Sequence, residues 1–227
     1  MTKAGQGALD LSRNHLAKDR AEALRLIPVS RETTERLDRF VALLLEWQAR
    51  INLIAPSTVP EIWTRHIADS LQLLEVIPGA KIWVDFGSGG GFPAIPIACA
   101  LAGTPGAQVH LIESNGKKAA FLREAVRVLH LPAQVHQTRV ENFGESWPAP
   151  ADVVTARALA PLKILCDQAL PLICQGAVGL FLKGQDVEVE LTEAAKYWTI
   201  EASTVPSKTS PEGCIVVIRS LKPRIRK

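Results

Sequence analysis

The chain contains 227 residues, of which 47% are hydrophobic and 22% are charged, and its formal net charge is +3. These values are those of a globular protein that is long enough to bury a full core. No apolar run is long enough to span a bilayer and residues 1–7 lack the apolar segment of a signal peptide, so we expect a cytoplasmic protein without membrane contact. The four cysteines form no C-x-x-C pair and have no histidine at ligand spacing, so we expect neither a metal site nor a disulfide framework.

Positive charge gathers at the two ends of the chain. The residues concerned are Lys3, Arg13, Lys18, Arg20, Arg25 and Arg31 near the start, and Lys222, Arg224, Arg226 and Lys227 at the end. Such clusters attract the phosphates of nucleic acids, and they are equally common as solubilising, disordered termini. The sequence leaves these two interpretations open.

Two helices are predicted before residue 80. Over residues 30–51, apolar side chains recur at helical spacing. Residues 58–61, Thr-Val-Pro-Glu, have the pattern of a capping box, and the helix that they begin is expected to end at residue 77, before Pro78 and Gly79. Residues 1–79 are therefore predicted to form an N-terminal helical extension.

The second of these helices carries a group of polar residues, Arg65, His66, Asp69 and Ser70, and two of them lie on its apolar stripe. A single histidine in such a position is explained by packing with a hydrogen-bond partner. The group of four instead indicates function, with Arg65 contacting phosphate and the pair His66 and Asp69 orienting the helix against the rest of the protein.

From residue 81 onward, predicted strands and helices alternate. Strands are expected at 81–86, 108–112, 134–138, 152–155 and 177–182, and helices from residue 93 and over 117–129 and 161–173. This alternation predicts an α/β fold in which helices cover both faces of a mostly parallel sheet. Residues 198–206 and 214–221 predict a C-terminal antiparallel hairpin. Residues 80–227 are thus expected to form one domain that packs with the helical extension as a single unit.

The glycine-rich loop after the first predicted strand is the most informative segment. Residues 84–93 read Val-Asp-Phe-Gly-Ser-Gly-Gly-Gly-Phe-Pro. Gly87, Gly89 and Gly91 let the backbone turn tightly and approach a ligand, and the following helix presents its N–H groups to it. A dinucleotide fingerprint requires glycine where this chain has Phe92, so an NAD-dependent oxidoreductase is disfavoured.

Two further polar residues end strands of the predicted sheet. Glu113 follows the second strand, about 20 residues beyond the glycine loop, where such folds hold a carboxylate that binds ribose. Arg157 follows the fourth strand, at the edge where ligands bind in open α/β sheets. Because the strand before it is apolar, the Arg157 charge requires an anion or an acid as its partner.

Several motifs occur in the order seen in the RsmG (GidB) family, and the match spans about residues 35–221. The motifs are Asn52-Leu53, 65–71 (Arg-His-Ile-Ala-Asp-Ser-Leu), 85–93, 113–122, Arg139-Val140-Glu141, Arg157-Ala158 and Lys183-Gly184. The resemblance implies the Rossmann-like fold of class I methyltransferases with S-adenosylmethionine (SAM) as cofactor. It also implies methylation of N7 of guanine 527 in 16S ribosomal RNA, with that RNA or the small ribosomal subunit as the partner of a monomeric enzyme.

The resemblance further implies the roles of individual residues. Residues expected to bind the cofactor are Asp85, Gly87, Ser88, Gly89, Gly91, Phe92, Glu113, Ser114, Val140, Glu141 and Arg157. Gly87 and Phe92 would surround the methionine and ribose, Glu113 would bind the ribose hydroxyls, and Val140 and Glu141 would contact the adenine. Residues expected to bind RNA are Arg65, His66, Lys117, Arg123 and Lys183, and Arg157 is the expected catalytic residue. The chain departs from the family at Ala156, where a serine is common, which removes a hydroxyl beside Arg157.

The absence of motifs used for other methyl acceptors agrees with transfer of the methyl group to a ring nitrogen. Guanine N7 carries a free lone pair and needs no base to remove a proton, so catalysis reduces to positioning and electrostatics. No Asn-Pro-Pro-Tyr or Asp-Pro-Pro-Tyr motif for an exocyclic amine follows the fourth strand, and no cysteine occupies the position of a nucleophile for carbon methylation. Arg157 is the best candidate to hold the guanine or a neighbouring phosphate. A small-molecule methyltransferase and a non-catalytic RNA-binding module remain as alternatives.

Overall fold

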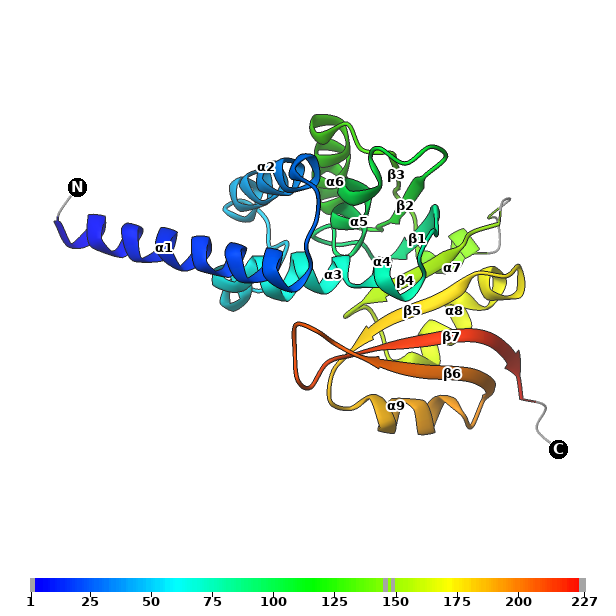
Figure 1. Ribbon diagram of the computed structural model, residues 1–227. Coiled ribbons are helices and arrows are strands. Elements are labelled where there is room, and N and C mark those ends of the chain that lie inside the picture. The colour runs from blue at the N-terminus through cyan, green and yellow to red at the C-terminus, as the bar shows by residue number, and fades with distance from the viewer. Residues whose placement is uncertain (1–2, 145–146, 148–149, 225–227) are drawn as a thin grey trace.

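A seven-stranded sheet in the order β3-β2-β1-β4-β5-β7-β6 forms the centre of the computed structural model, which describes residues 3–144, 147 and 150–224, with side chains from residue 14 onward (Figure 1). The strands are β1 (Ile82–Phe86), β2 (Gln108–Ile112), β3 (Ala133–His136), β4 (Val153–Arg157), β5 (Val178–Lys183), β6 (Trp198–Pro206) and β7 (Cys214–Pro223). The pairs among β1 to β5 are parallel, and β7 is antiparallel to both β5 and β6. The predicted fold and its C-terminal hairpin are confirmed.

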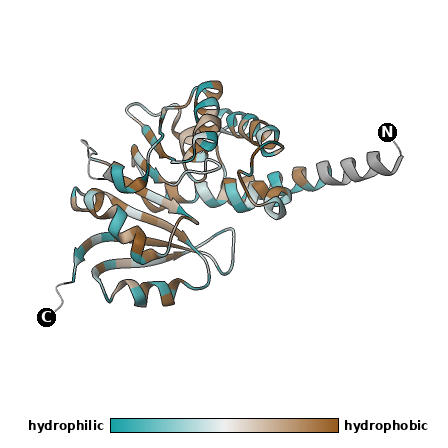
Figure 2. Cartoon of the chain, turned by 180° about the vertical axis from the view of Figure 1, so that it is seen from behind, coloured by the Kyte–Doolittle hydropathy of each residue, from teal (hydrophilic) through white to brown (hydrophobic). Residues whose placement is uncertain are grey.

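Both faces of the sheet are buried, because successive side chains of a strand point to opposite sides. Trp83 of β1 belongs to the core on one face, whereas its neighbour Val84 belongs to the core on the other face. Helices α2 (Arg31–Gln48), α5 (Ala94–Leu101) and α6 (Gly116–Leu129) pack on the first face, and α8 (Leu162–Cys174) packs on the second. This double burial explains why the parallel strands read as apolar runs (Figure 2).

Helix α1 (Lys3–Leu26) projects from the body at its N-terminal end (Figure 1) and is docked through its C-terminal half. The buried Asp19 carboxylate accepts hydrogen bonds from the backbone N–H groups of Trp63 (2.7 Å) and Thr64 (3.2 Å). Lys3, Arg13, Lys18, Arg20 and Arg25 of the N-terminal basic cluster thus belong to a helix. Arg226 and Lys227 of the C-terminal basic cluster lie outside the described residues.

The single helix predicted for residues 58–77 is wrong. The structure instead has a 3-10 turn η1 (Pro56–Glu61), a π-helical turn η2 (Trp63–Ala68), and short helices α3 (Asp69–Leu71) and α4 (Leu73–Val76). The Thr58 hydroxyl does not cap a helix. It donates to Ala55 O (2.8 Å) and contacts His66 Nε2 (2.8 Å). The threonine of the capping-box pattern therefore binds His66 instead of the first turn of a helix.

Three helices were not predicted individually: α1, α7 (Val140–Gly144) and α9 (Val187–Ala194). Residues 187–190 read Val-Glu-Val-Glu, a pattern of period two, yet they form a helix whose Glu190 carboxylate turns inward. It accepts hydrogen bonds from Lys183 Nζ (2.6 Å) and Leu162 N (2.6 Å). Within the described part of the chain, no helix combines the length and the apolar character that crossing a membrane requires.

Candidate functional site

The glycine loop connects β1 to α5 and has the backbone conformation that the sequence predicted. Gly87, Gly89 and Gly91 all have positive φ angles, of 66°, 52° and 91°. A Cβ atom at Gly91 would lie 2.7 Å from Ile95 Cγ1, so this glycine permits close packing of the helix on the loop. A Cβ at Gly89 would instead point into open space, with Gly87 O at 3.6 Å as its nearest neighbour. That open side is where a ligand can approach the backbone.

Glu113 follows β2 and fixes the shape of this loop. Its Oε2 accepts a hydrogen bond from Gly89 N (2.9 Å) and its Oε1 from Asn115 N (2.7 Å). Each carboxylate oxygen has a second lone pair, so Glu113 can also bind hydroxyl groups of a ligand. The next residue, Ser114, is exposed at the mouth of the site.

Asp85 lies at the end of β1, beneath the loop, and is almost fully buried. Its Oδ1 accepts a hydrogen bond from Thr155 Oγ1 (2.8 Å), whereas Oδ2 is buried without a partner among the described residues. Burial raises the pKa of Asp85 to about 7. An unpartnered buried carboxylate oxygen is expected to be satisfied by a donor, and a cationic ligand group would favour its ionised form.

A cavity of about 360 Å³ opens between the glycine loop and the segments that follow β2, β3 and β4. The predicted cofactor residues that line it are Gly87, Gly89, Glu113, Ser114, Val140, Glu141 and Arg157. Asp85, Ser88, Gly91 and Phe92 are buried in the packing of the loop instead. Lys118, Thr138, Arg139 and Ala158 also line the cavity, although none of them was among the predicted cofactor residues, and the lining residues that the sequence analysis missed are Ile112, Leu159 and Gln168.

Arg157 ends β4 and is held by the polar segment that was predicted to be functional. Its NH1 contacts His66 Nδ1 (2.7 Å), its NH2 donates to Arg65 O (2.7 Å), and its Nε lies 3.4 Å from Asp69 Oδ2. The acid required by the Arg157 charge is therefore Asp69, whose Oδ1 accepts a hydrogen bond from the Thr209 hydroxyl (2.8 Å) in the β6–β7 connection. Burial raises the pKa of Asp69 and lowers that of Arg157, and the attraction between the two opposes both shifts.

The neighbours of His66 define its tautomer. Because the Thr58 hydroxyl donates its proton to Ala55 O, it accepts from Nε2–H of His66, and Nδ1 is left to accept from Arg157. Burial, helped by the charge of Arg157, lowers the pKa of His66 to about 3, so the ring is neutral at physiological pH. The ring also lies against Phe92 of the glycine loop, with 4.8 Å between the ring centroids.

The five predicted RNA-binding residues fall into two groups. Arg65, Lys117 and Arg123 are exposed. Two are buried or nearly so: His66 is enclosed between Arg157 and Phe92, and Lys183, with 10% of its side chain exposed, binds Glu190 and Ala160 O. A role in shaping the site, rather than direct contact with RNA, fits the positions of these two residues.

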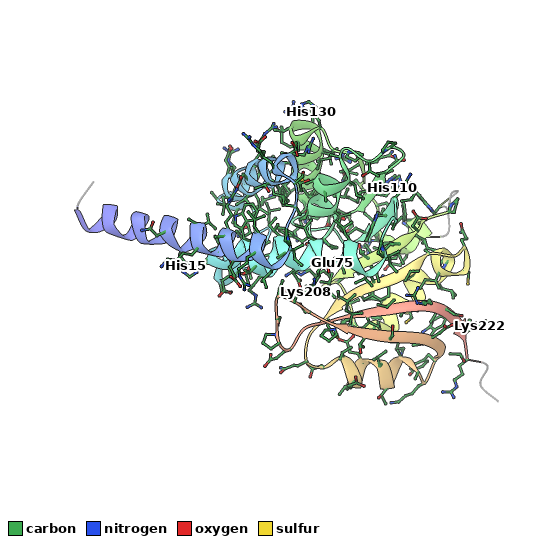
Figure 3. All side chains as sticks on the ribbon, in the orientation of Figure 1. His15, Glu75, His110, His130, Lys208 and Lys222 are labelled. Atoms are coloured by element: carbon green, nitrogen blue, oxygen red, sulfur yellow. The ribbon has the colours of Figure 1, made fainter. Side chains whose placement is uncertain are left out.

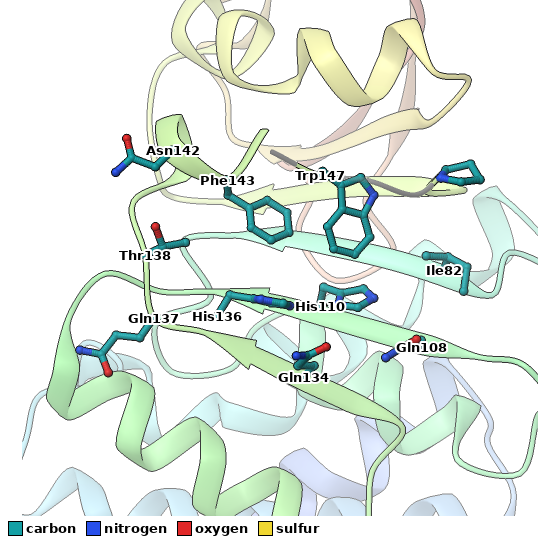
Figure 4. Close-up of a pocket in the computed structure, with 11 residues that line it drawn as sticks. Ile82, Gln108, His110, Gln134, His136, Gln137, Thr138, Asn142, Phe143 and Trp147 are labelled. Atoms are coloured by element: carbon teal, nitrogen blue, oxygen red, sulfur yellow. Dashed lines mark hydrogen bonds between the residues drawn. The ribbon is translucent and has the colours of Figure 1, made fainter. Parts of the chain in front are cut away.

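Two larger hollows lie outside the cofactor cavity. A groove of about 760 Å³ runs from Arg157 and Leu159 past Lys183 and Val189 to the β6–β7 connection, where Glu75 and Lys208 meet (Figure 3). A cavity of about 920 Å³ lies over β2 and β3. Figure 4 shows His110, His136, Phe143 and Trp147 among the side chains around it, and no residue of the glycine loop lines it. Arg157 lines both the cofactor cavity and the groove.

The sheet order, the glycine loop after β1 and the carboxylate after β2 together define a SAM-dependent methyltransferase fold. Solved structures agree on the fold. The O-methyltransferase from Bacillus cereus in complex with SAH superposes with a TM-score of 0.55 at 15% identity, covering 91% of this chain and 99% of that one. Cofactor-bound Rv0187 from MTB gives a TM-score of 0.55 at 16% identity, covering 82% and 90%.

Sequence relatives identify the family. The GidB family model, described as rRNA small subunit methyltransferase G, matches residues 33–215, and the chain belongs to this family. A protein of that name from Bradyrhizobium sp. (strain BTAi1 / ATCC BAA-1182) is 62% identical over 203 residues, which are 89% of this chain and 91% of the relative. The protein of the same name from Nitrobacter hamburgensis is 54% identical over 226 residues, covering 100% and 85%. Fold and family together identify SAM as the cofactor.

Proposed function

We propose that this protein methylates N7 of guanine 527 in the 16S RNA of the small ribosomal subunit, with SAM as the methyl donor. The names of its relatives support ribosomal RNA of the small subunit as the substrate. The observation that carries the proposal is the position of Arg157, which lines both the cofactor cavity and the adjoining groove. A group held by Arg157 in the groove would thus lie beside the cofactor.

The residues around the cavity fit SAM. Gly89 offers an open backbone surface, Glu113 has free lone pairs for ribose hydroxyls, and Val140 and Glu141 line the part of the cavity assigned to adenine. Asp85 lies beneath the glycine loop and outside the cavity lining, so it would act on the cofactor through the loop rather than by direct contact. When bound, SAM supplies a methyl group on a positively charged sulfur.

Arg157 retains donors for the acceptor base. A guanidinium has five N–H groups, and the contacts to His66, Arg65 O and Asp69 use one on each nitrogen, so NH1 and NH2 each keep one. On guanine, O6 and N7 lie side by side as acceptors on one edge of the base. An N–H group of Arg157 bound to O6 would orient the base and leave N7 free to react.

No residue needs to remove a proton from N7, because its lone pair is available throughout the neutral range. The contribution of the protein is then to hold the base in position. Negative charge near the base would also help, because the ring becomes cationic as it accepts the methyl group. The exposed cations Arg65, Lys117 and Arg123 suit contacts with phosphates, which position an RNA without reading its sequence.

A single-turnover assay with labelled SAM and 16S RNA, followed by mapping of the methylated base, tests this proposal. Naked RNA and small subunits are compared, because either is a possible partner. At saturating RNA we expect a rate that is nearly constant between about pH 6 and 9. A rate that rises tenfold per pH unit through neutrality indicates an acceptor that must lose a proton, and label on any other base contradicts the proposal. Activity on small molecules alone favours the alternative methyltransferase class.

A further inference from the structure

Gln168 of α8 lines the cofactor cavity, although it belongs to none of the motifs found in the sequence. Its Nε2 donates a hydrogen bond to Glu141 Oε1 (2.8 Å). An ionised carboxylate can only accept, so this bond fixes the orientation of the amide and turns the other end, Oε1, away from Glu141.

Gln168 Oε1 is buried and has no hydrogen-bond partner among the described residues. Buried polar atoms without partners are rare in native proteins, because such an atom has lost its contact with water without replacement. Gln168 is thus a strong acceptor beside the cavity that lacks a donor.

The position of Gln168 indicates which part of the cofactor supplies that donor. The cavity is lined by Gly87, Gly89 and Glu113 and also by Val140 and Glu141. Under the proposed function, the ribose lies at Glu113 and the adenine at Val140 and Glu141. The contact between Gln168 and Glu141 therefore puts the unpartnered oxygen on the adenine side, where adenine carries its exocyclic amine, a group with two N–H donors.

We propose that Gln168 Oε1 accepts a hydrogen bond from the exocyclic amine of the cofactor adenine and makes the site selective for adenine over hypoxanthine. Hypoxanthine carries a carbonyl oxygen in place of the amine, and that oxygen would face the Gln168 acceptor with no proton between them. A site built to bind a donor rejects an analogue that lacks it, since its own polar groups are then left unpaired.

The inference rests on the proposed function only for the identity of the cofactor, and its test is a binding measurement. Calorimetry compares S-adenosylhomocysteine with S-inosylhomocysteine, on the native protein and on Gln168→Leu. The native protein is expected to prefer the adenosyl ligand. In Gln168→Leu that preference should fall by about tenfold, the effect of one hydrogen bond, mainly through weaker adenosyl binding.

Gln175→Leu is the matched control, because it makes the same chemical change at an exposed position beside the end of α8. It should leave both affinities unchanged. Equal losses for both ligands in Gln168→Leu indicate a packing role and overturn the inference, as does an unchanged preference. If Gln168→Leu does not fold, a native protein that binds both ligands equally still overturns it. If the native protein binds neither ligand, the cofactor assignment itself fails.

Discussion

The substitution Asp69→Asn tests whether the ion pair with Arg157 holds the site together. Asp69 and Arg157 have only 14% and 20% of their side chains exposed, so their charges are mostly shielded from water. Asparagine has nearly the shape of aspartate and retains an oxygen that can accept from Thr209. The substitution thus removes the charge while it preserves most of the packing.

The expected loss of folding free energy depends on the hydrogen bonds that Arg157 retains in the variant. Removing one partner of a fully buried ion pair costs about 3–5 kcal/mol, because the other charge is left uncompensated. Arg157 retains its bonds to Arg65 O and His66 Nδ1, both 2.7 Å long, so a loss of about 2 kcal/mol is expected, close to that of one hydrogen bond to a charged group. For a chain of this size, such a loss lowers the melting temperature by about 4–8 °C.

Glu61→Gln is the matched control for this experiment. It removes a carboxylate from the same segment, but Glu61 and its partner Arg65 are half exposed and 3.8 Å apart, so its effect should stay below about 1 kcal/mol. Thermal melts of both variants are compared with the native protein, together with single-turnover methylation at saturating SAM. We expect Asp69→Asn alone to lower both quantities. Equal melting temperatures for the two variants contradict the assigned role of Asp69.

Three further outcomes are expected. Gly89→Val should abolish SAM binding in calorimetry while the protein stays folded by circular dichroism, because the side chain would fill the open side of the loop; native affinity contradicts the assigned site. Because burial raises the pKa of Asp85 to about 7, folding in the absence of cofactor becomes less favourable as pH rises from about 4 to 7. Asp85→Asn should therefore gain melting temperature relative to the native protein over that range, and a constant difference between the two speaks against a buried ionisable carboxylate. Arg65→Ala should weaken RNA binding and make the affinity less dependent on salt concentration. If the dependence of affinity on salt is unchanged, other residues contact the phosphates.

The parallel sheet and the cofactor end of the site could be predicted from the sequence because their signals are local. A strand buried on both faces must be apolar, and a loop with positive φ angles at Gly87, Gly89 and Gly91 must contain glycine. Glu113 follows from its spacing after that loop. The prediction of one helix over residues 58–77 was wrong for the opposite reason, because the structure there depends on contacts that are not local. The polar residues Thr58 and His66 form tertiary contacts, and these decide the local backbone more strongly than helical spacing does.

The acceptor side of the site could be predicted only in part, because it is assembled from segments that are remote in the chain. The sequence identified Arg157 as a charge that needs an acid and noted Asp69 separately, but nothing in the pattern joined the two. Thr209 is 140 positions from Asp69, and its hydroxyl donor had no local signal at all. Gln168 was missed for a related reason, since one glutamine on an amphipathic helix is ordinary until the structure turns it toward Glu141. The motifs thus identify the glycine loop and Glu113, which line the cavity, whereas the side chains that hold Arg157 in place depend on the packing of three separate parts of the fold.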